Sequence, residues 1–404
     1  MSGTPVPAPA AASAAAPVPA PAPVPSPGTG TGPGRDFDHG LVIGKFYPPH
    51  AGHHFLIRTA ADTCRRVTVV AMAADVESVP LADRVAWLRE AYADRPHVAV
   101  TGVTDNLAVD YGSGAAWDGH TALMREAVAA GPHRARPVDA VFTSEPYGAE
   151  LARRFGAADV RLDPGRDTFA VSGTAVRADP AAFWDALEPP VRAWFALRVV
   201  VVGAESTGTT TLSRDLAAAL RSRGGPHALT RWVPEYGREL TVAKLAVARA
   251  RAALAGAPEP AVSDLDWDDA DFESVARRQC ADEEAAARAG GPVLVCDTDA
   301  LATTVWQERY RGRSTPAVRA AADRMPPRSL YLLTDDAGVP FHDDGLRDGE
   351  HLRPWMTGRF REVLAASGTP WLEVRGGRDA RLLRALQAVD ALVAEGRRLA
   401  DPLG

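Results

Sequence analysis

Cysteine and long apolar stretches are scarce in this sequence of 404 residues, and an excess of positive charge is absent. Its three cysteines form no CxxC pair and no His-linked metal spacing, which argues against a zinc site or a disulfide framework. No stretch reaches the roughly 18 uncharged apolar residues that a membrane span needs. The net charge of -6 argues against a primary nucleic-acid binder, which normally carries a basic excess. We therefore expect a cytoplasmic protein that binds neither membranes nor nucleic acid.

Charge is also absent from the beginning of the chain. After Met1, the residues up to 34 are all Pro, Ala, Val, Gly, Ser or Thr. Such a segment cannot build a packed core, so we predict a disordered tail over residues 1–36. The chain as a whole is 46% hydrophobic and 24% charged, which is typical of a folded protein with room for two or three domains.

Apolar, β-branched runs alternate with helical patterns after the tail. The predicted strands lie at residues 67–72, 98–100, 138–143 and 160–162, and then at 198–203, 230–234, 292–297 and 329–334. This alternation is typical of parallel βαβ units. Because Glu188-Pro189-Pro190 interrupts it, we predict an α/β fold of two doubly wound parallel-sheet domains, at residues 37–192 and 196–400.

The first domain opens with a motif suited to a nucleoside triphosphate. The apolar run Leu41-Val42-Ile43 leads into GKFYPPHAGH at residues 44–53, before a helix predicted over 53–63. His50 and His53 lie one helical turn apart at a helix start, where free backbone N–H groups favour anions. Two histidines there could also be mere surface polarity, but the complete strand–motif–helix context is more specific. The phosphate-binding candidates are Gly44, Lys45, Phe46, His50, Gly52 and His53.

A second motif, VSGTAVR at residues 171–177, ends the same domain. It offers the hydroxyls of Ser172 and Thr174 at a helix start and Arg177 one turn later. Helix capping is the commoner role of such hydroxyls. Together with the histidine motif, however, the pattern resembles the second signature of the nucleotidylyltransferase superfamily, which implies that Arg177 grips the β- and γ-phosphates.

The second domain begins with a phosphate-binding loop that departs from the usual pattern. The predicted strand 198–203 runs into a Gly-x4-Gly-x-Thr sequence whose backbone N–H groups can approach phosphates. Thr210 would hold Mg²⁺, whereas Thr209 replaces the usual lysine. Either another cation, such as Arg347 or Arg353, takes over, or any phosphoryl transfer at this loop is slow or lost. The loop candidates are Gly203, Glu205, Ser206, Thr207, Gly208, Thr209 and Thr210.

Two carboxylates follow predicted strand ends in this domain, where ligands collect in open α/β sheets. Asp297 closes an apolar strand and is a candidate Mg²⁺ ligand. Glu235 could orient or deprotonate a substrate hydroxyl, and Arg238 could bind phosphate. A helix cap or a surface ion pair is the alternative for each. The charged segment 343–353 is either a lid or a solvated loop, and the acidic cluster at 264–271 is most simply a solvated helix start.

The order of these motifs resembles one family over roughly residues 38 to 395. The motifs, in sequence order, are GKFYPPHAGH, DRVAW at 83–87, the Trp117 region, FTSEP at 142–146, VSGTAVR, the loop at 203–210, EYGRE at 235–239, DTD at 297–299 and DDGLR at 343–347. They occur in the order seen in the NadR-like family, which joins nicotinamide-mononucleotide adenylyltransferase to ribosylnicotinamide kinase. Motifs ordered across two domains are more specific than any one of them.

The resemblance implies two reactions that use ATP as a co-substrate and Mg²⁺ as a cofactor. In the first domain, nicotinamide mononucleotide and ATP give NAD and pyrophosphate, with Lys45, His50, His53 and Arg177 aligning the phosphates. In the second, nicotinamide riboside is phosphorylated, with Arg347 reaching the nucleotide. The implied substrate contacts are Trp117, Asp83, Arg84, Trp87, Tyr236 and Arg238, although Trp117 could equally be core and 83–87 an ordinary amphipathic helix. Relatives also suggest a homo-oligomer.

Three other interpretations stay open. The nearest is a pantetheine-phosphate adenylyltransferase fused to a dephospho-coenzyme A kinase, to which EYGRE and DDGLR do not belong. The second is a nucleotide-sensing regulator that binds ATP or NAD without turnover, and the third is a monofunctional adenylyltransferase. Both are consistent with a loop that lacks the usual lysine. Some relatives carry an N-terminal DNA-binding helix-turn-helix; because a Pro/Ala tail replaces it here, we predict no DNA binding.

Overall fold

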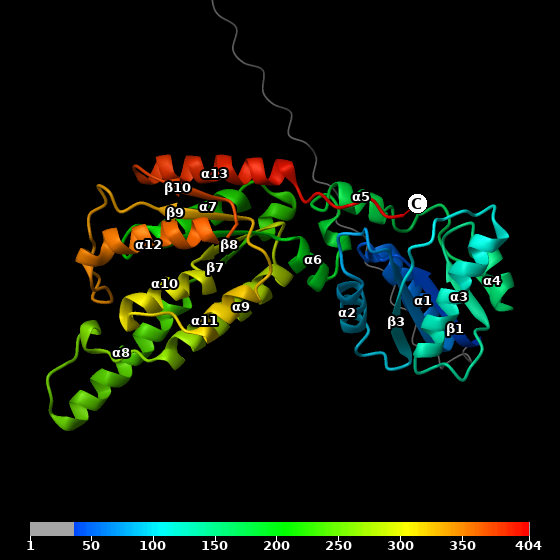
Figure 1. Cartoon of the computed structure of the whole chain (residues 1–404), viewed down its shortest axis with the longest axis horizontal. Helices are drawn as coiled ribbons and strands as arrows, with labels where there is room; N and C mark the ends of the chain where they lie inside the picture. Colours follow the sequence, from blue (N-terminus) through cyan, green and yellow to red (C-terminus); the bar gives the residue numbers. More distant parts are fainter. Residues whose placement is uncertain (1–35, 404) are drawn as a thin grey trace, which may run out of the picture. The chain divides into compact units, whose positions relative to one another are not determined.

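The computed structural model describes residues 36–403, so the predicted tail at residues 1–36 lies outside the described residues except for Asp36. The described part contains two five-stranded sheets with helices between successive strands (Figure 1). Every strand pairing in both sheets is parallel. The predicted fold class, two doubly wound α/β units, is confirmed.

The first sheet has the strand order β3-β2-β1-β4-β5. Its strands are β1 (Phe37–Gly44), β2 (Cys64–Ala73), β3 (Val98–Thr104), β4 (Ala140–Thr143) and β5 (Ala158–Arg161). The helices that follow them are α1 (Ala51–Thr63), α2 (Leu81–Ala91), α3 (Gly114–Ala130), α4 (Gly148–Phe155) and α5 (Gly173–Ala178). The chain order reverses at β1, which pairs with β2 on one side and β4 on the other. Ligands of open α/β sheets bind at the carboxyl ends of strands beside such a reversal.

The second sheet has the order β10-β9-β6-β8-β7, again with its first strand in the centre. Its strands are β6 (Leu197–Gly203), β7 (Arg231–Val233), β8 (Val293–Asp297), β9 (Leu330–Thr334) and β10 (Trp371–Val374). Its helices are α7 (Thr209–Arg221), α8 (Tyr236–Ala255), α9 (Asp269–Ala289), α10 (Ala300–Arg311), α11 (Pro316–Asp323), α12 (Arg353–Ala366) and α13 (Arg378–Glu395). Short 3₁₀ turns lie at η2 (Gly225–Leu229), η3 (Val262–Asp264) and η4 (Glu350–Leu352).

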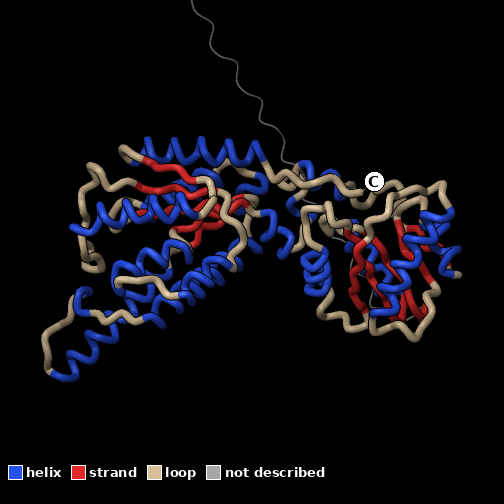
Figure 2. The backbone as a smooth tube through the Cα atoms, in the orientation of Figure 1, coloured by secondary structure: helices blue, strands red, loops and turns tan. Residues whose placement is uncertain are grey.

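Apolar side chains bury both faces of each central strand. In the first sheet, Ile57 of α1 packs in one cluster with Val42 and Val69. In the second, Leu216 of α7 packs in one cluster with Val199 and Leu332. Strands covered on both faces are near-continuous apolar runs, which is why the sequence shows them clearly. Figure 2 shows the resulting strands, in red, enclosed by helices.

The segment between the two sheets contains the 3₁₀ turn η1 (Trp184–Ala186) and α6 (Pro189–Phe195). The predicted boundary between residues 192 and 196 therefore falls at the end of α6. In the described part of the chain, no helix has both the length and the apolar character needed to cross a bilayer.

Candidate functional site

The histidines of the first motif form a buried, neutral pair at the carboxyl edge of the first sheet. His50 is the N-cap residue of α1, and its ring centroid lies 3.8 Å from that of His53. Burial lowers the pKa of His50 to about 3 and the pKa of His53 well below its ordinary value. The Nδ1 atoms of both rings are buried without a hydrogen-bond partner in the described structure. Both imidazoles are thus uncharged at neutral pH and retain hydrogen-bonding capacity for a ligand.

The cavity beside this pair contains a cation that the sequence analysis missed. His50, His53 and Arg166 line it together with Glu145 and Ser172. Arg166 has a positive φ of 55° and donates to Glu145 Oε1 at 2.8 Å. No motif marks Arg166, because it lies in the loop after β5; the turn-rich run Asp163-Pro164-Gly165 is the local signal.

The VSGTAVR motif is tied to the histidine motif by its arginine. Arg177 donates to the Tyr47 carbonyl at 2.8 Å, and its guanidinium lies 4.8 Å from the centre of the Tyr47 ring. Its second nitrogen donates to Thr174 Oγ1 at 3.2 Å, while Ser172 caps α5 by accepting from the Ala175 N–H. The structure thus gives Ser172 its commoner capping role. The phosphate contact of Arg177 stays a prediction.

A second cavity of the first sheet is aromatic, and Trp117 lines it as expected for a ring-binding site. Tyr111 and Tyr147 stack with centroids 5.9 Å apart and planes 9° apart, and Trp117 lies 6.0 Å and 6.5 Å from them. Lys45 and Asp105 line the same cavity. Asp105 and Tyr111 lie in the loop after β3, and Tyr147 lies in the loop after β4. They were missed because no contiguous motif marks them and only the fold brings the two loops together.

Lys45 lies beside a buried ion pair. Arg84 and Glu77, both with fully buried side chains, lie 2.6 Å apart, and Lys45 Nζ lies 3.8 Å from the other Glu77 oxygen. Arg84 also donates to the carbonyls of Lys45 at 2.9 Å and Val79 at 2.7 Å. Lys45 donates to the Leu403 carbonyl, and burial lowers its pKa.

This network changes the interpretation of the DRVAW motif. The predicted substrate contact of Arg84 is not available, because its nitrogens serve protein acceptors inside the core. Trp87 is also buried and packs edge-on against Trp194 at 6.1 Å. Neither Trp87 nor Asp83 is among the residues that line these two cavities. A helical pattern alone could not show that Arg84 faces inward.

In the second sheet, the loop after β6 has the geometry of a phosphate-binding loop. A Cβ on Gly203 would lie 2.1 Å from Thr334 Oγ1, and Gly208 has a φ of 89°, so both positions require glycine. The Thr207 hydroxyl is turned inward, 2.7 Å from the Ala204 carbonyl and 2.6 Å from Thr334 Oγ1. Thr207 can therefore bind an anion through its backbone N–H but not through its hydroxyl. α7 begins at Thr209, so its N-terminus faces the loop.

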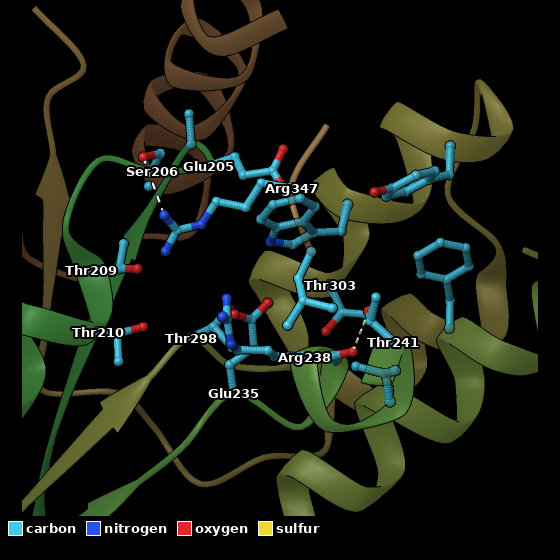
Figure 3. Close-up of a pocket in the computed structure, with 18 of the residues that line it drawn as sticks. Glu205, Ser206, Thr209, Thr210, Glu235, Arg238, Thr241, Thr298, Thr303 and Arg347 are labelled. Atoms are coloured by element: carbon cyan, nitrogen blue, oxygen red, sulfur yellow. Dashed lines mark hydrogen bonds between the residues drawn. The ribbon is translucent and has the colours of Figure 1, made fainter. Parts of the chain in front are cut away.

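Carboxylates gather at the cavity beside this loop, as Figure 3 shows for Glu205 and Glu235. Burial, more than any neighbouring charge, raises the pKa of Glu205 to about 7 and that of Glu235 to about 8. Asp297, the last residue of β8, is 2% exposed, and burial raises its pKa to about 6. It interacts with the hydroxyls of Thr210 and Thr209.

These oxygens fit a magnesium ion that is shared with phosphates. Mg²⁺ prefers oxygen ligands and is usually held by one or two carboxylates together with substrate phosphates and water. The interacting pair of Asp297 and Thr210 offers such a partial set beside the phosphate-binding loop. Within residues 36–403, no group of three or more His, Cys, Asp or Glu side chains is arranged to hold a metal by itself.

Two arginines complete the polar part of the cavity. Arg238 of α8 donates to Asp344 Oδ2 at 2.5 Å, and Arg347 lies 3.8 Å from the same oxygen. Arg347 also lies 3.4 Å from Ser206 Oγ of the loop (Figure 3). The segment 343–353 is thus in contact with the cavity, as expected of a lid. The predicted substrate residue Tyr236 does not line this cavity; its ring lies 5.6 Å from the Arg278 guanidinium.

The apolar wall of the cavity was not predicted. It consists of Trp267, Phe272, Val275, Trp306 and Tyr310. These residues come from α9, α10 and the segment before α9, so only the fold brings them together. The predicted solvated helix start at 264–271 is confirmed, because Asp268 caps α9 by accepting from the Asp271 N–H.

Comparison with known proteins agrees with both sheets. A family model described as an AAA domain matches residues 198–381. The trifunctional NAD biosynthesis/regulator protein NadR of Escherichia coli K12 is 26% identical over 374 residues, which cover 89% of this chain and 84% of that protein. Its counterpart in Salmonella typhimurium LT2 is 26% identical over 376 residues, covering 88% and 83%. The chain thus resembles the NadR proteins along most of its length.

Solved structures of NadR proteins share the fold of this NadR-like chain. A NadR protein in complex with NR superimposes with a TM-score of 0.66 at 23% identity, covering 89% of this chain and 98% of that chain. A NadR protein in complex with NAD and AMP-PNP gives a TM-score of 0.63 at 22% identity, covering 89% and 97%.

Proposed function

We propose that this chain functions in NAD biosynthesis by catalysing two consecutive reactions. The second sheet phosphorylates nicotinamide riboside, and the first sheet transfers the adenylyl group of ATP to the resulting mononucleotide. The observation that carries the proposal is the presence of two separate phosphate-binding motifs, each at the carboxyl edge of its own parallel sheet. The names of the NadR relatives, and the NR, NAD and AMP-PNP bound by solved NadR proteins, support the same pathway.

Adenylyl transfer needs alignment and charge neutralisation rather than a protein nucleophile. A phosphate oxygen of the mononucleotide attacks the α-phosphorus of ATP, and the bond to the β-phosphate oxygen breaks to release pyrophosphate. His50 and His53 are already uncharged and desolvated, so they can donate hydrogen bonds to the leaving pyrophosphate. Lys45 lies next to the aromatic cavity, where Trp117 would stack on the nicotinamide ring.

Phosphorylation of the riboside requires a base and a bound metal. Glu235 lines the cavity, and its raised pKa suits it to accept the proton of the 5′-hydroxyl as that oxygen attacks the γ-phosphorus. The bond from the γ-phosphorus to the bridging β-phosphate oxygen breaks, and ADP leaves. Mg²⁺, held by Asp297 and Thr210, would neutralise charge between the β- and γ-phosphates. Arg238 faces the same cavity and would bind phosphate.

Thr209 favours a second candidate function for the C-terminal half. Without the loop lysine, the second sheet could bind ATP or NAD as a sensor, or serve a monofunctional adenylyltransferase, without turning over substrate. One experiment separates the candidates: incubate the protein with Mg-ATP and either nicotinamide mononucleotide or nicotinamide riboside, then separate the nucleotides. We expect NAD from both. NAD from the mononucleotide alone would support a monofunctional adenylyltransferase. NAD from neither substrate would support a nucleotide sensor.

A further inference from the structure

The phosphate-binding loop of the second sheet carries no positive charge of its own. A loop lysine normally reaches the β- and γ-phosphates, but residues 203–210 contain no Lys or Arg, and Thr209 stands in the lysine position. A triphosphate bound there needs a cation from another segment, because Asp297, Glu205 and Glu235 bring only negative charge or neutral acid to the cavity. The question is which arginine can supply it.

Two buried arginines, Arg381 and Arg353, do not line the cavity and donate to backbone carbonyls, although Arg353 Nε has no partner among the described residues. Arg381, 6% exposed, donates to the carbonyls of Gly376, Thr207 and Asp335 at 2.6 to 2.8 Å. Arg353, also 6% exposed, donates to the carbonyls of Val339 and Asp336. Arg353, one of the two replacements suggested by the sequence, is therefore a structural residue that holds its own segment.

Arg309 also contacts the loop, but its charge is already neutralised. Its side chain is 2% exposed, lies 2.9 Å from Glu205 Oε2, and donates to Asp348 at 2.5 Å. Moving it to a phosphate would leave two carboxylates without their partner in a buried place, which is costly. Arg309 thus neutralises the charge of Glu205 and is not available to neutralise the charge of a ligand.

Among the described residues that line the cavity, the cations are Arg238 and Arg347. Arg238 belongs to α8, and its guanidinium lies beside Glu235 (Figure 3) and pairs with Asp344. Arg347 reaches the loop itself, 3.4 Å from Ser206 Oγ, and the Ser206 hydroxyl also accepts from the His342 N–H at 2.8 Å. Its side chain is 23% exposed, so it is open to a ligand.

We propose that Arg347 takes the place of the loop lysine and pairs with the β- and γ-phosphates. This inference rests on the proposed ATP binding of the second sheet. The charge then comes from the segment 343–353 instead of from α7, and Ser206 sets the position of that segment on the loop. A guanidinium can pair with phosphate through two parallel hydrogen bonds, which a lysine cannot do.

The test compares R347Q, T209K, the double variant T209K/R347Q and the control R313Q. Arg313 is a surface residue paired with Asp269, so R313Q removes an equal charge outside the cavity. Riboside-dependent ATP consumption and AMP-PNP titration by calorimetry are measured for each. Adenylyl transfer by the same preparations reports whether each variant is folded.

We expect R347Q to lower kcat/KM for ATP in the kinase reaction about 100-fold, the usual effect of removing one transition-state donor. The double variant should recover to within about fivefold of the parent, because T209K restores the usual lysine. R313Q and all adenylyl-transfer rates should stay unchanged.

Equal kinase rates and equal AMP-PNP affinities in R347Q and R313Q would overturn the proposal, as would a double variant no better than R347Q. A parent chain without riboside-dependent turnover would refute the kinase function but not this inference. In that event, the inference stands if R347Q weakens AMP-PNP binding at one site and T209K restores it, and it falls if AMP-PNP affinity is unchanged.

Discussion

The two candidate sites differ in how their polar groups are held. In the first sheet, Lys45, His50 and His53 all lie within ten residues of chain, from the end of β1 into the first turn of α1, and the buried pair of Arg84 and Glu77 contacts Lys45. In the second, the loop contributes no cation, and Arg238 and Arg347 arrive from α8 and the segment 343–353. The first site is preformed, whereas the second must be assembled from separate segments.

This difference has a chemical consequence. The histidines of the first site are neutral because burial disfavours their charged form, and they can donate hydrogen bonds without first losing water. The carboxylates of the second site resist ionisation for the same reason, so a metal ion has to displace their protons. The two sites should respond differently to mutation and to pH.

The largest separation of the two activities should come from Asp297→Asn. The amide is nearly isosteric but carries no charge for Mg²⁺, so we expect kinase kcat to fall about 10²- to 10³-fold, the scale of losing one preorganised electrostatic contact. Adenylyl transfer by the same preparation should not change. Asp264→Asn, a control in the solvated acidic cluster, should leave both rates intact. Retention of more than a tenth of the kinase rate in the Asp297 variant would show that this carboxylate does not bind the metal.

The reciprocal change is His53→Asn. We expect adenylyl transfer to fall about 100-fold, because one desolvated donor to pyrophosphate is lost, while kinase activity remains. Steady-state production of NAD from the mononucleotide measures this loss. His227→Asn, at a position that lines none of the three cavities, is the matched control. A parallel loss of both activities would indicate misfolding rather than a role at the first site.

A smaller effect is expected for Trp117→Phe in the aromatic cavity. Phenylalanine keeps an aromatic face but removes the indole ring and its hydrogen bond to the Tyr111 carbonyl. Since aromatic stacking contributes about 0.5 to 1.5 kcal/mol, KM for the mononucleotide should rise by up to about tenfold with kcat nearly unchanged. An unchanged KM with a lowered melting temperature would make Trp117 a core residue only.

The mildest test uses pH. Glu205, Glu235 and Asp297 have pKa values of about 7, 8 and 6, so the protonated fraction of each rises as the pH falls from 8 to 6. Protons then compete with Mg²⁺, and the apparent magnesium affinity of the kinase reaction should weaken over this range. Adenylyl transfer should depend less on pH there, because the pKa of His50 is about 3. A kinase reaction whose magnesium demand does not change with pH would exclude Asp297 as a metal ligand.

The sequence predicted the sheets well because their central strands are apolar on both faces. β10 was missed: its four residues, Trp371–Val374, include a glutamate and form a half-exposed edge. Motifs contiguous in the chain, such as 44–53 and 203–210, were found. Arg166, Tyr147 and Trp306 were not, because they meet their sites only through folding.

Asp344 pairs with Arg238 and lies 3.8 Å from Arg347, and this gives the second site a built-in competitor. A carboxylate tethered beside its arginines acts at an effective concentration on the order of millimolar or higher. A weakly charged anion such as inorganic phosphate cannot displace it at ordinary concentrations. We expect the cavity to discriminate by total charge and to admit a triphosphate while it rejects smaller anions that contain the same chemical group.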